Sequence, residues 1–190
     1  MFKVLAVAAF AIWPLVPITW LQVHSKPEFW RKLGVRAYAL ILSEWLAVAV
    51  LAITFQRFLL GEQLNFGAAS WLGAPFFLAG IGLNIWTGKI MGLKALVGYP
   101  ELKTKETSGR LVIAGPFSIV RHPTYLAHIV ILLGVFVITN YTGTGMLALL
   151  DFLISYFGIV PLEERELLER FGDDYRMYRN RVPKFFPRLP

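Results

Sequence analysis

The sequence lacks cysteine and has little charge. None of its 190 residues is Cys, and Asp, Glu, Lys and Arg together make up only 16%, compared with about 25% in typical soluble domains. The absence of cysteine excludes disulfide bonds and thiolate metal sites. The three histidines, His24, His122 and His128, lack the spacing of a metal site, so we predict no bound metal. The low charge excludes an ordinary water-soluble domain.

Hydrophobic residues dominate the composition. They make up 56% of the chain, and its mean hydropathy is +0.58. We therefore predict a single all-α integral membrane domain that covers residues 1–190. The net charge of +7 is compatible with nucleic-acid binding, but the cations lie in clusters between apolar runs, as they do in loops on one face of a bilayer. We expect contact with membrane lipids and no nucleic acid.

Five apolar runs approach the length of about 20 residues that a membrane-spanning helix needs. The first run has no small-x-small cleavage site, so we interpret it as a membrane helix, kinked by prolines, rather than as a signal peptide. The connection between the last two runs is short, which predicts an antiparallel hairpin. The spans are predicted at about 2–23, 36–60, 71–96, 123–139 and 145–162, followed by a cytosolic segment 163–190 with an amphipathic helix.

The loop charges predict the orientation of these spans. Lys and Arg are frequent in the first and third connections and in the C-terminal segment, and they are nearly absent from the second and fourth connections. Because cytoplasmic loops carry the excess of cations, we predict the N-terminus outside and the C-terminus in the cytosol. The segment before the fourth span then lies on the same side as the C-terminal segment.

The most unusual chemistry of the sequence lies just before the fourth span, where residues 115–125 read GPFSIVRHPTY. The Gly-Pro pair predicts a turn, and Pro123 suits the first turn of a helix. Two interpretations remain open. Either Arg121 is an interfacial anchor for phosphate headgroups, or Arg121, His122 and Tyr125 belong to a functional site.

Acidic residues occur both after the fifth span and inside the spans. Glu163 and Glu164 are either a solvated helix face or carboxylates that hold the hydroxyl or ammonium groups of a cofactor. Glu44 and Asp151 lie within spans, where buried charge is costly and usually functional. Lys89 can pair with either of them, and the roles of these three residues stay open between structure, proton transfer and substrate contact.

These features together resemble the isoprenylcysteine carboxyl methyltransferase and phospholipid methyltransferase family of integral membrane enzymes. The family pattern G-x-Y-x-x-x-R-H-P-x-Y matches residues 115–125, with Phe117 in place of tyrosine. A Leu-Val pair lies upstream, at Leu111-Val112. The Glu163-Glu164 pair, FGDDYRMY and VPKFFP follow in the order that is typical of the family.

The resemblance implies S-adenosylmethionine as the cofactor and a lipophilic or membrane-associated methyl acceptor at the cytosolic face. It implies that Arg121, which would orient an anionic group, and Glu164 are catalytic. Five spans suit a compact prokaryotic member in the cell membrane. The implied cofactor-binding residues are Gly80, Gly82, Leu111, Val112, Gly115, Phe117, His122, Pro123, Thr124, Tyr125, Glu163 and Glu164.

Besides Phe117, two positions depart from the family. Gly109 stands where many relatives have histidine, and Ile159 stands where prenylcysteine enzymes have an arginine assigned to the substrate, so we do not expect prenylcysteine as the acceptor. Two alternatives remain: an NADPH-dependent membrane reductase of the sterol or steroid type, which shares the Arg-His-Pro block, and a non-enzymatic membrane scaffold or transporter. The identity of the acceptor, any general base and the oligomeric state do not follow from the sequence.

Overall fold

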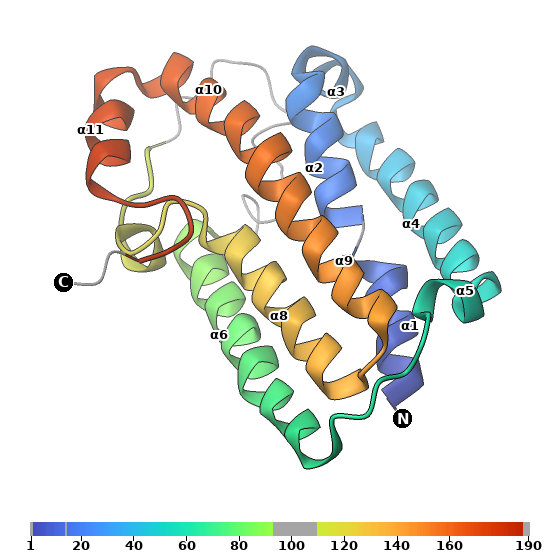
Figure 1. Cartoon of the computed structure of the whole chain (residues 1–190). Helices are drawn as coiled ribbons and strands as arrows, with labels where there is room; N and C mark the ends of the chain where they lie inside the picture. Colours follow the sequence, from blue (N-terminus) through green and yellow to red (C-terminus); the bar gives the residue numbers. More distant parts are fainter. Residues whose placement is uncertain (1, 14, 93–109, 188–190) are drawn as a thin grey trace.

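The structure, a computed structural model, describes residues 2–13, 15–92 and 110–187 of the chain. Every extended regular element in these ranges is a helix (Figure 1). The protein is an all-α integral membrane protein, as the sequence predicts. One apolar helix, Pro123–Thr139, is shorter than the others. Four helices are long and apolar enough to cross a membrane: Phe2–Ser25, Pro27–Thr54, Gly67–Met91 and Thr142–Phe171.

The N-terminal part of the chain consists of two broken helices. The first predicted span is interrupted at Trp13. The next residue is Pro14, and proline has no backbone N–H to donate to a helical hydrogen bond. The second predicted span ends earlier than residue 60, because the α-helix stops at Thr54 and a separate short helix follows. The elements are α1 (Phe2–Ile12), α2 (Leu15–Ser25), α3 (Pro27–Leu33), a 3-10 turn (Gly34–Arg36), α4 (Ala37–Thr54) and α5 (Gln56–Leu60).

The C-terminal part supplies the centre of the bundle. α8 occupies the predicted range of the fourth span, whereas α6 ends before residue 92, and the predicted residues 93–96 lie outside the described part of the chain. The elements are a 3-10 turn (Gly67–Leu72), α6 (Gly73–Met91), a 3-10 turn (Gly115–Ser118), α8 (Pro123–Thr139), α9 (Thr142–Leu153), a π-helical segment (Ile154–Ile159), α10 (Val160–Phe171) and α11 (Asp173–Arg181).

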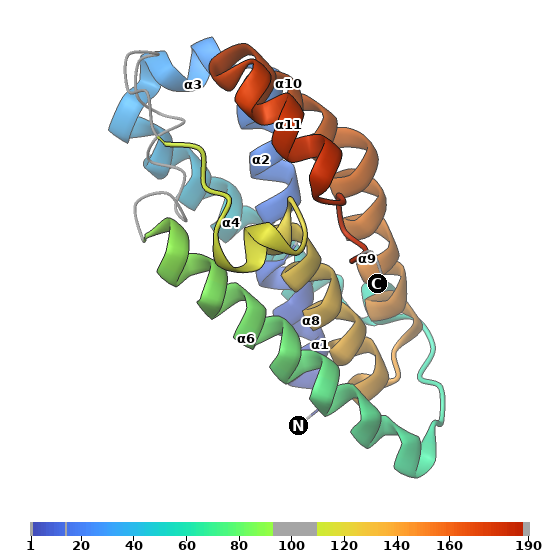
Figure 2. The same ribbon diagram turned by 90° about the vertical axis from the view of Figure 1, so that its left-hand side faces the viewer.

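α8 lies between α6 and α9 and also packs on α1 (Figures 1 and 2). Glycines let α6 approach α8 closely. A Cβ atom on Gly80 would lie 2.6 Å from Ile131 Cγ1 and 2.8 Å from the Ala127 carbonyl oxygen, and one on Gly134 would lie 2.5 Å from the Phe77 nitrogen. Small residues therefore provide the helix contact here, as is common in membranes.

The turn between α8 and α9 is tight. α8 ends at Thr139 and is capped by Asn140, whose φ of 61° places it in the left-handed region. The Thr139 and Thr144 hydroxyls lie 3.2 Å apart across the turn, and the Asn140 side chain donates to Ser70 Oγ at 2.8 Å. α8 and α9 form the predicted antiparallel hairpin, and its turn is bonded to the 3-10 turn that precedes α6.

The predicted C-terminal helix consists of two helices, and the first continues from the last span. α9, the π-helical segment and α10 form one helix from Thr142 to Phe171. The π segment precedes Pro161, which has no N–H for a regular α-helical bond. Gly172 has a φ of 54°, so the chain turns there and α11 folds back beside α10.

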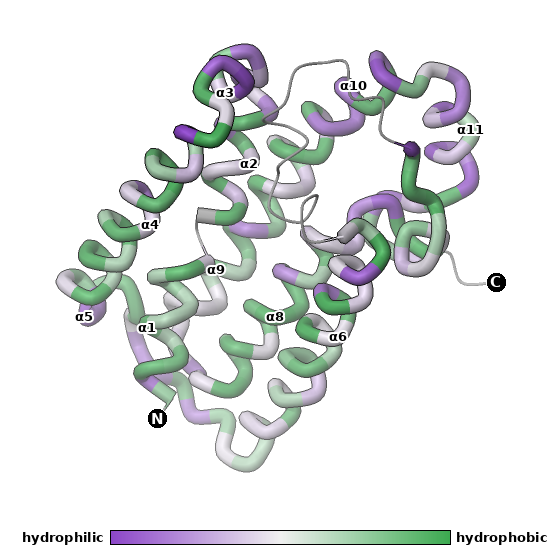
Figure 3. Tube along the Cα trace, turned by 180° about the vertical axis from the view of Figure 1, so that it is seen from behind, coloured by the Kyte–Doolittle hydropathy of each residue, from purple (hydrophilic) through white to green (hydrophobic). Residues whose placement is uncertain are grey.

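The two ends of the bundle differ in polarity. Hydrophilic residues concentrate along α3, α10 and α11, whereas most of α1, α4 and α8 is hydrophobic (Figure 3). The N-terminus and the α8–α9 turn lie at the opposite end (Figure 1). We call the end formed by α3, α10 and α11 the charged end of the bundle.

Candidate functional site

The Arg-His-Pro motif lies at the start of α8, at the charged end of the bundle. Gly115 has a φ of 61°, which allows the 3-10 turn Gly115–Ser118 to begin against α6. A Cβ atom on this glycine would lie 3.1 Å from Ile90 Cγ1. His122 is the N-cap residue of α8, and Pro123 occupies its first turn. The 3-10 turn therefore positions Arg121 and His122 just before α8, at the charged end of the bundle.

Arg121 is engaged by four hydrogen bonds within the protein. Its Nε and Nη2 donate to Glu164 Oε1 at 3.0 and 2.7 Å. Its Nη1 donates to the backbone carbonyls of Arg179, at 3.0 Å, and of Val182. The side chains of Arg121 and Glu164 are only 9% and 8% exposed. The guanidinium thus joins the start of α8 to α10 and to the C-terminal tail, by which we mean residues 179–187, from the last turn of α11 onward.

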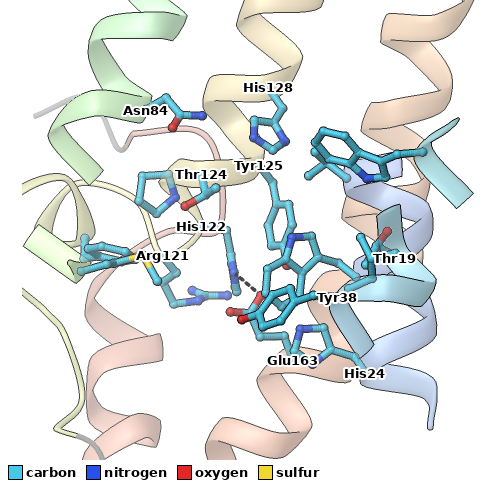
Figure 4. A pocket seen from close by; sticks show the side chains of 17 residues that line it. Thr19, His24, Tyr38, Asn84, Arg121, His122, Thr124, Tyr125, His128 and Glu163 are labelled. Atoms are coloured by element: carbon cyan, nitrogen blue, oxygen red, sulfur yellow. Dashed lines mark ion pairs between the residues drawn. The ribbon is translucent and has the colours of Figure 1, made fainter. Parts of the chain in front are cut away.

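His122 lies between two carboxylates. Its Nε2 is 3.1 Å from Glu164 Oε1. Its Nδ1 is 3.3 Å from Glu163 Oε2 (Figure 4). Burial opposes protonation of the imidazole, but the two carboxylates outweigh burial and raise the pKa of His122 above its ordinary value. His122 therefore lies within hydrogen-bond distance of Glu164 and within ion-pair distance of Glu163, and its ring links the two carboxylates.

The C-terminal tail closes over this cluster. The backbone N–H groups of Arg121 and His122 donate to the carbonyls of Pro183 and Lys184 at 2.8 and 3.3 Å. Phe185 is 1% exposed and packs with Tyr125 and other apolar residues of α8 and α10. The tail therefore folds back against the bundle and forms part of the structure that supports the motif.

A cavity of about 440 Å³ lies beside the motif, between α2, α4, α6 and the start of α8 (Figure 4). Polar groups in its wall include Arg121, His122 and Glu163. The residues that line it are Val16, Thr19, Trp20, His24, Tyr38, Ile41, Trp45, Asn84, Met91, Phe117, Arg121, His122, Pro123, Thr124, Tyr125, His128 and Glu163. This combination of apolar walls and a few polar groups is typical of small-molecule sites.

The structure brings together about half of the predicted site residues. Phe117, Arg121, the His122–Tyr125 stretch and Glu163 all line the cavity. Glu164 does not line it and instead holds Arg121 and His122 from behind. The catalytic roles assigned to Arg121 and Glu164 stay predictions, and their contacts indicate positioning of the loop and the tail.

The other predicted residues lie outside the cavity wall. Gly80 packs against α8, and Gly82 has no neighbour within 4 Å of a Cβ position. Leu111 packs instead with Tyr175, Tyr178 and Val182 of the tail region. Three further predicted residues are also absent from the cavity lining: Val112, Gly115 and Glu164. Gly109, one of the departures from the family pattern, lies outside the described residues.

Sequence reasoning missed the contribution of the first two spans to the cavity. α2 supplies His24 and Trp20, α4 supplies Tyr38, and His128 faces the cavity from α8 (Figure 4). The signal that could have found them is a polar residue inside an apolar run, which is usually functional in membrane proteins. Asn84 of α6 carries the same signal.

The acidic residues inside the spans, Glu44 and Asp151, do not line the cavity. Asp151 is 3% exposed in α9, and neither of its carboxylate oxygens has a hydrogen-bond partner among the described residues. Glu44 Oε2 is also buried without such a partner in this part of the chain. Lys89 is exposed on α6. Within residues 2–13, 15–92 and 110–187, no cluster of three or more His, Asp or Glu side chains is arranged to hold a metal ion.

Comparison with known protein families decides the identity of the bundle. The sequence model of the phospholipid methyltransferase family matches residues 68–174, which is more than half of the chain. The chain belongs to the phospholipid methyltransferase family. The match covers α6, α8, α9 and α10, and therefore the Arg-His-Pro motif and both glutamates. The part of the cavity wall that α2 and α4 form lies outside the matched residues.

Individual relatives of this phospholipid methyltransferase family member share shorter segments. The chain is 34% identical to the cobalt-zinc-cadmium resistance protein CzcN of Cupriavidus metallidurans over 42% of this chain and 36% of that protein. It is 39% identical to methanethiol S-methyltransferase 1 of Bradyrhizobium diazoefficiens over 37% of this chain and 24% of that protein.

A eukaryotic relative is also similar. The protein-S-isoprenylcysteine O-methyltransferase of Schizosaccharomyces pombe is 34% identical over 42% of this chain and 34% of its own length. The matched segments thus span between about a quarter and just over a third of these relatives. No solved structure matches the chain. The family and two of these relatives are named for methyl transfer, and these names give no support to the reductase or transporter alternatives.

Proposed function

We propose that the protein is an S-adenosylmethionine-dependent methyltransferase that methylates a lipophilic acceptor at the cytosolic face of the membrane. The observation that carries the proposal is the cavity of about 440 Å³, in which the family motif at His122 and the carboxylate of Glu163 meet apolar residues from two other spans. A polar cofactor and an apolar acceptor need this kind of mixed wall.

The residues present fit the cofactor in size and in chemistry. The volume falls within the range of roughly 300–1,000 Å³ for small-molecule sites. Glu163 lies in the wall, and its side chain is 29% exposed, so its carboxylate can accept hydrogen bonds from ribose hydroxyls or an ammonium group. Trp20 and Tyr38 offer aromatic faces for a purine ring.

Catalysis in such a site depends on positioning. Bound S-adenosylmethionine supplies a methyl group on a positively charged sulfonium, and transfer is an in-line displacement that requires aligned reactants. In the proposed mechanism Glu163 binds the cofactor, and His122 holds Glu163 in place through the 3.3 Å contact. Arg121 keeps the loop and the tail together, and apolar residues such as Ile41 exclude water from the reacting atoms.

We further propose that this end of the bundle faces the cytosol. The charged end carries the basic residues of α3 and α11, and cytosolic loops are the ones enriched in Lys and Arg. A cytosolic cofactor can then enter from water. An acceptor with an apolar tail can enter from the bilayer, since α4 carries exposed Leu42, Leu46 and Val50 on its outer surface.

A thermal-shift measurement on the detergent-purified protein tests the cofactor assignment. S-adenosylhomocysteine at about 100 times its Kd should stabilise the fold by about 2.7 kcal/mol, whereas NADPH should leave the unfolding temperature unchanged. Glu163→Gln should weaken the response. The exposed Glu169 on the same helix provides the matched control, and Glu169→Gln should keep it. Stabilisation by NADPH alone would favour a reductase and would contradict the proposal.

A further inference from the structure

A second cavity lies apart from the site described above. It has a volume of about 580 Å³ and is bordered by the segment 110–118 on one side and by α11 on the other. These two stretches of chain lie side by side at the charged end of the bundle (Figures 1 and 2). The two cavities share no lining residue. We call the second cavity the α11 groove.

The two walls of the α11 groove are joined to each other. The Tyr178 hydroxyl donates to the Phe117 carbonyl at 2.7 Å. Leu111 packs against a buried cluster that contains Tyr175, Tyr178 and Val182. The groove is therefore a feature of the packed structure, and its walls keep a defined separation.

The charged side chains of the groove are two arginines and one aspartate. Asp174, Met177 and Arg181 are spaced by three and four residues, so they share one face of α11, and Arg110 lines the opposite wall. Among residues 2–13, 15–92 and 110–187, neither Arg110 nor Arg181 has a side-chain hydrogen bond or an ion pair. Two guanidinium groups without partners favour a ligand with anionic oxygens, since guanidinium binds phosphate through paired hydrogen bonds.

The groove also has apolar surface and lies at the boundary of the membrane-spanning helices. Ile113 and Met177 line it, and each is 52% exposed. Within the segment 110–118, a Cβ atom on Gly115 would lie 3.1 Å from Ile90 Cγ1, in the last turn of α6, and α8 begins shortly afterwards at Pro123. The groove therefore lies at the level where two helices of the bundle end, which is the depth of lipid headgroups.

We propose that the α11 groove binds an anionic phospholipid of the surrounding leaflet. The phosphate lies between Arg110 and Arg181, a headgroup hydroxyl donates to Asp174, and the acyl chains begin at Ile113 and Met177. The lipid joins the loop before α8 to α11. It also gives the protein an interfacial anchor for phosphate, a role that Arg121 does not provide because its guanidinium is bonded within the protein.

Native mass spectrometry of delipidated protein in a neutral detergent tests this site. Dioleoyl phosphatidylglycerol should bind more tightly than dioleoyl phosphatidylcholine, because the groove carries two arginines and one acid. Arg110→Gln and Arg181→Gln should each raise the Kd for phosphatidylglycerol about fivefold, and the double variant about 30-fold.

Arg176→Gln is the matched control for these variants. It removes the same charge from α11, but Arg176 pairs with Asp173 and does not line the groove. Its Kd should stay at the wild-type value. If all three single variants weaken binding equally, the affinity reflects net charge alone, and the proposed site is wrong.

A soluble headgroup distinguishes a lipid from a free phosphate. Phosphatidylglycerol should raise the unfolding temperature of the wild type, whereas glycerol phosphate at the same concentration should not, because it lacks the chains that contact Ile113 and Met177. Equal stabilisation by glycerol phosphate would show a site for a soluble anion and would overturn the proposal.

This inference stands independently of the proposed methyl transfer. Arg110 and Arg181 lie outside the cavity assigned to the cofactor, so the double variant should keep the wild-type response to S-adenosylhomocysteine. That response also shows that the variant is folded. Absence of the response in the wild type rejects the proposed function alone, and equal affinity for the two phospholipids rejects the lipid site alone.

Discussion

Replacing Arg121 by glutamine should destabilise the protein strongly. The substitution removes two charge-assisted bonds to Glu164 and two bonds to tail carbonyls. Glu164 is left as a carboxylate that is only 8% exposed, and breaking such a buried pair costs about 3–5 kcal/mol. His122 keeps its contact with the same carboxylate, so we expect the lower part of that range.

Unfolding of the purified protein in mild detergent, followed by circular dichroism, measures this loss. Glu164→Gln in the Arg121→Gln background should add little, because the two side chains act as a pair. Arg176→Gln is the matched control, since its partner Asp173 is exposed and surface pairs contribute little. Trypsin should also cleave the tail of the Arg121 variant sooner, because Arg179 and Val182 lose their anchor.

A wild-type unfolding midpoint in Arg121→Gln would refute this reasoning. If methyl transfer were lost at the same time, Arg121 would act on a ligand, as the resemblance implies. If stability falls and the double variant shows the expected non-additivity, the role of Arg121 is instead to hold together the loop before α8 and the tail.

Three further predictions follow from the geometry. The pKa of His122 is raised, so its pairing with the carboxylates stabilises the fold fully below pH of about 6.5. This contribution falls as the pH rises through the raised pKa, and the unfolding temperature should decline there. Glu163→Gln should weaken the decline. Gly80→Leu should cost about 1–3 kcal/mol by overpacking α8, whereas Gly82→Leu, with open space around it, should leave the melting temperature near that of the wild type. Because the chain has no native cysteine, single cysteines can report its orientation. A membrane-impermeant maleimide should label Glu62→Cys in intact cells and Asn180→Cys only after permeabilisation. The reverse pattern would mean that the orientation is opposite to the proposed one.

The sequence predicts the helices well where it carries strong local signals. α8 begins at Pro123 and ends at Thr139, next to Asn140, and both Pro123 and Asn140 are residue types that favour a helix boundary. Between the fifth span and the following helix the sequence offers only Pro161 as a boundary signal, and the π-helical segment before it accommodates the missing N–H without a break. The helix is therefore continuous until Gly172.

The site was only partly predictable, for two physical reasons. A membrane helix is apolar on the faces toward lipid and toward protein alike, so periodicity does not show that His24 of α2 or Tyr38 of α4 faces a cavity. For the same reason, a glycine pattern does not distinguish Gly80, which packs on α8, from Gly82, which has open space. The pairing of Arg121 with the tail spans 58 or more residues and leaves no local trace.

The closure of the tail over Arg121 has a consequence for how the protein is made. Val182 follows Arg121 by 61 residues, which corresponds to about 3–12 s of synthesis at 5–20 residues per second. During that interval the start of α8 can enter the membrane while the guanidinium still contacts water or lipid phosphate. Glu164 arrives next, and the tail carbonyls arrive last. During biogenesis Arg121 therefore first acts as an anchor at the membrane interface and later, once Glu164 and the tail are in place, as part of the site.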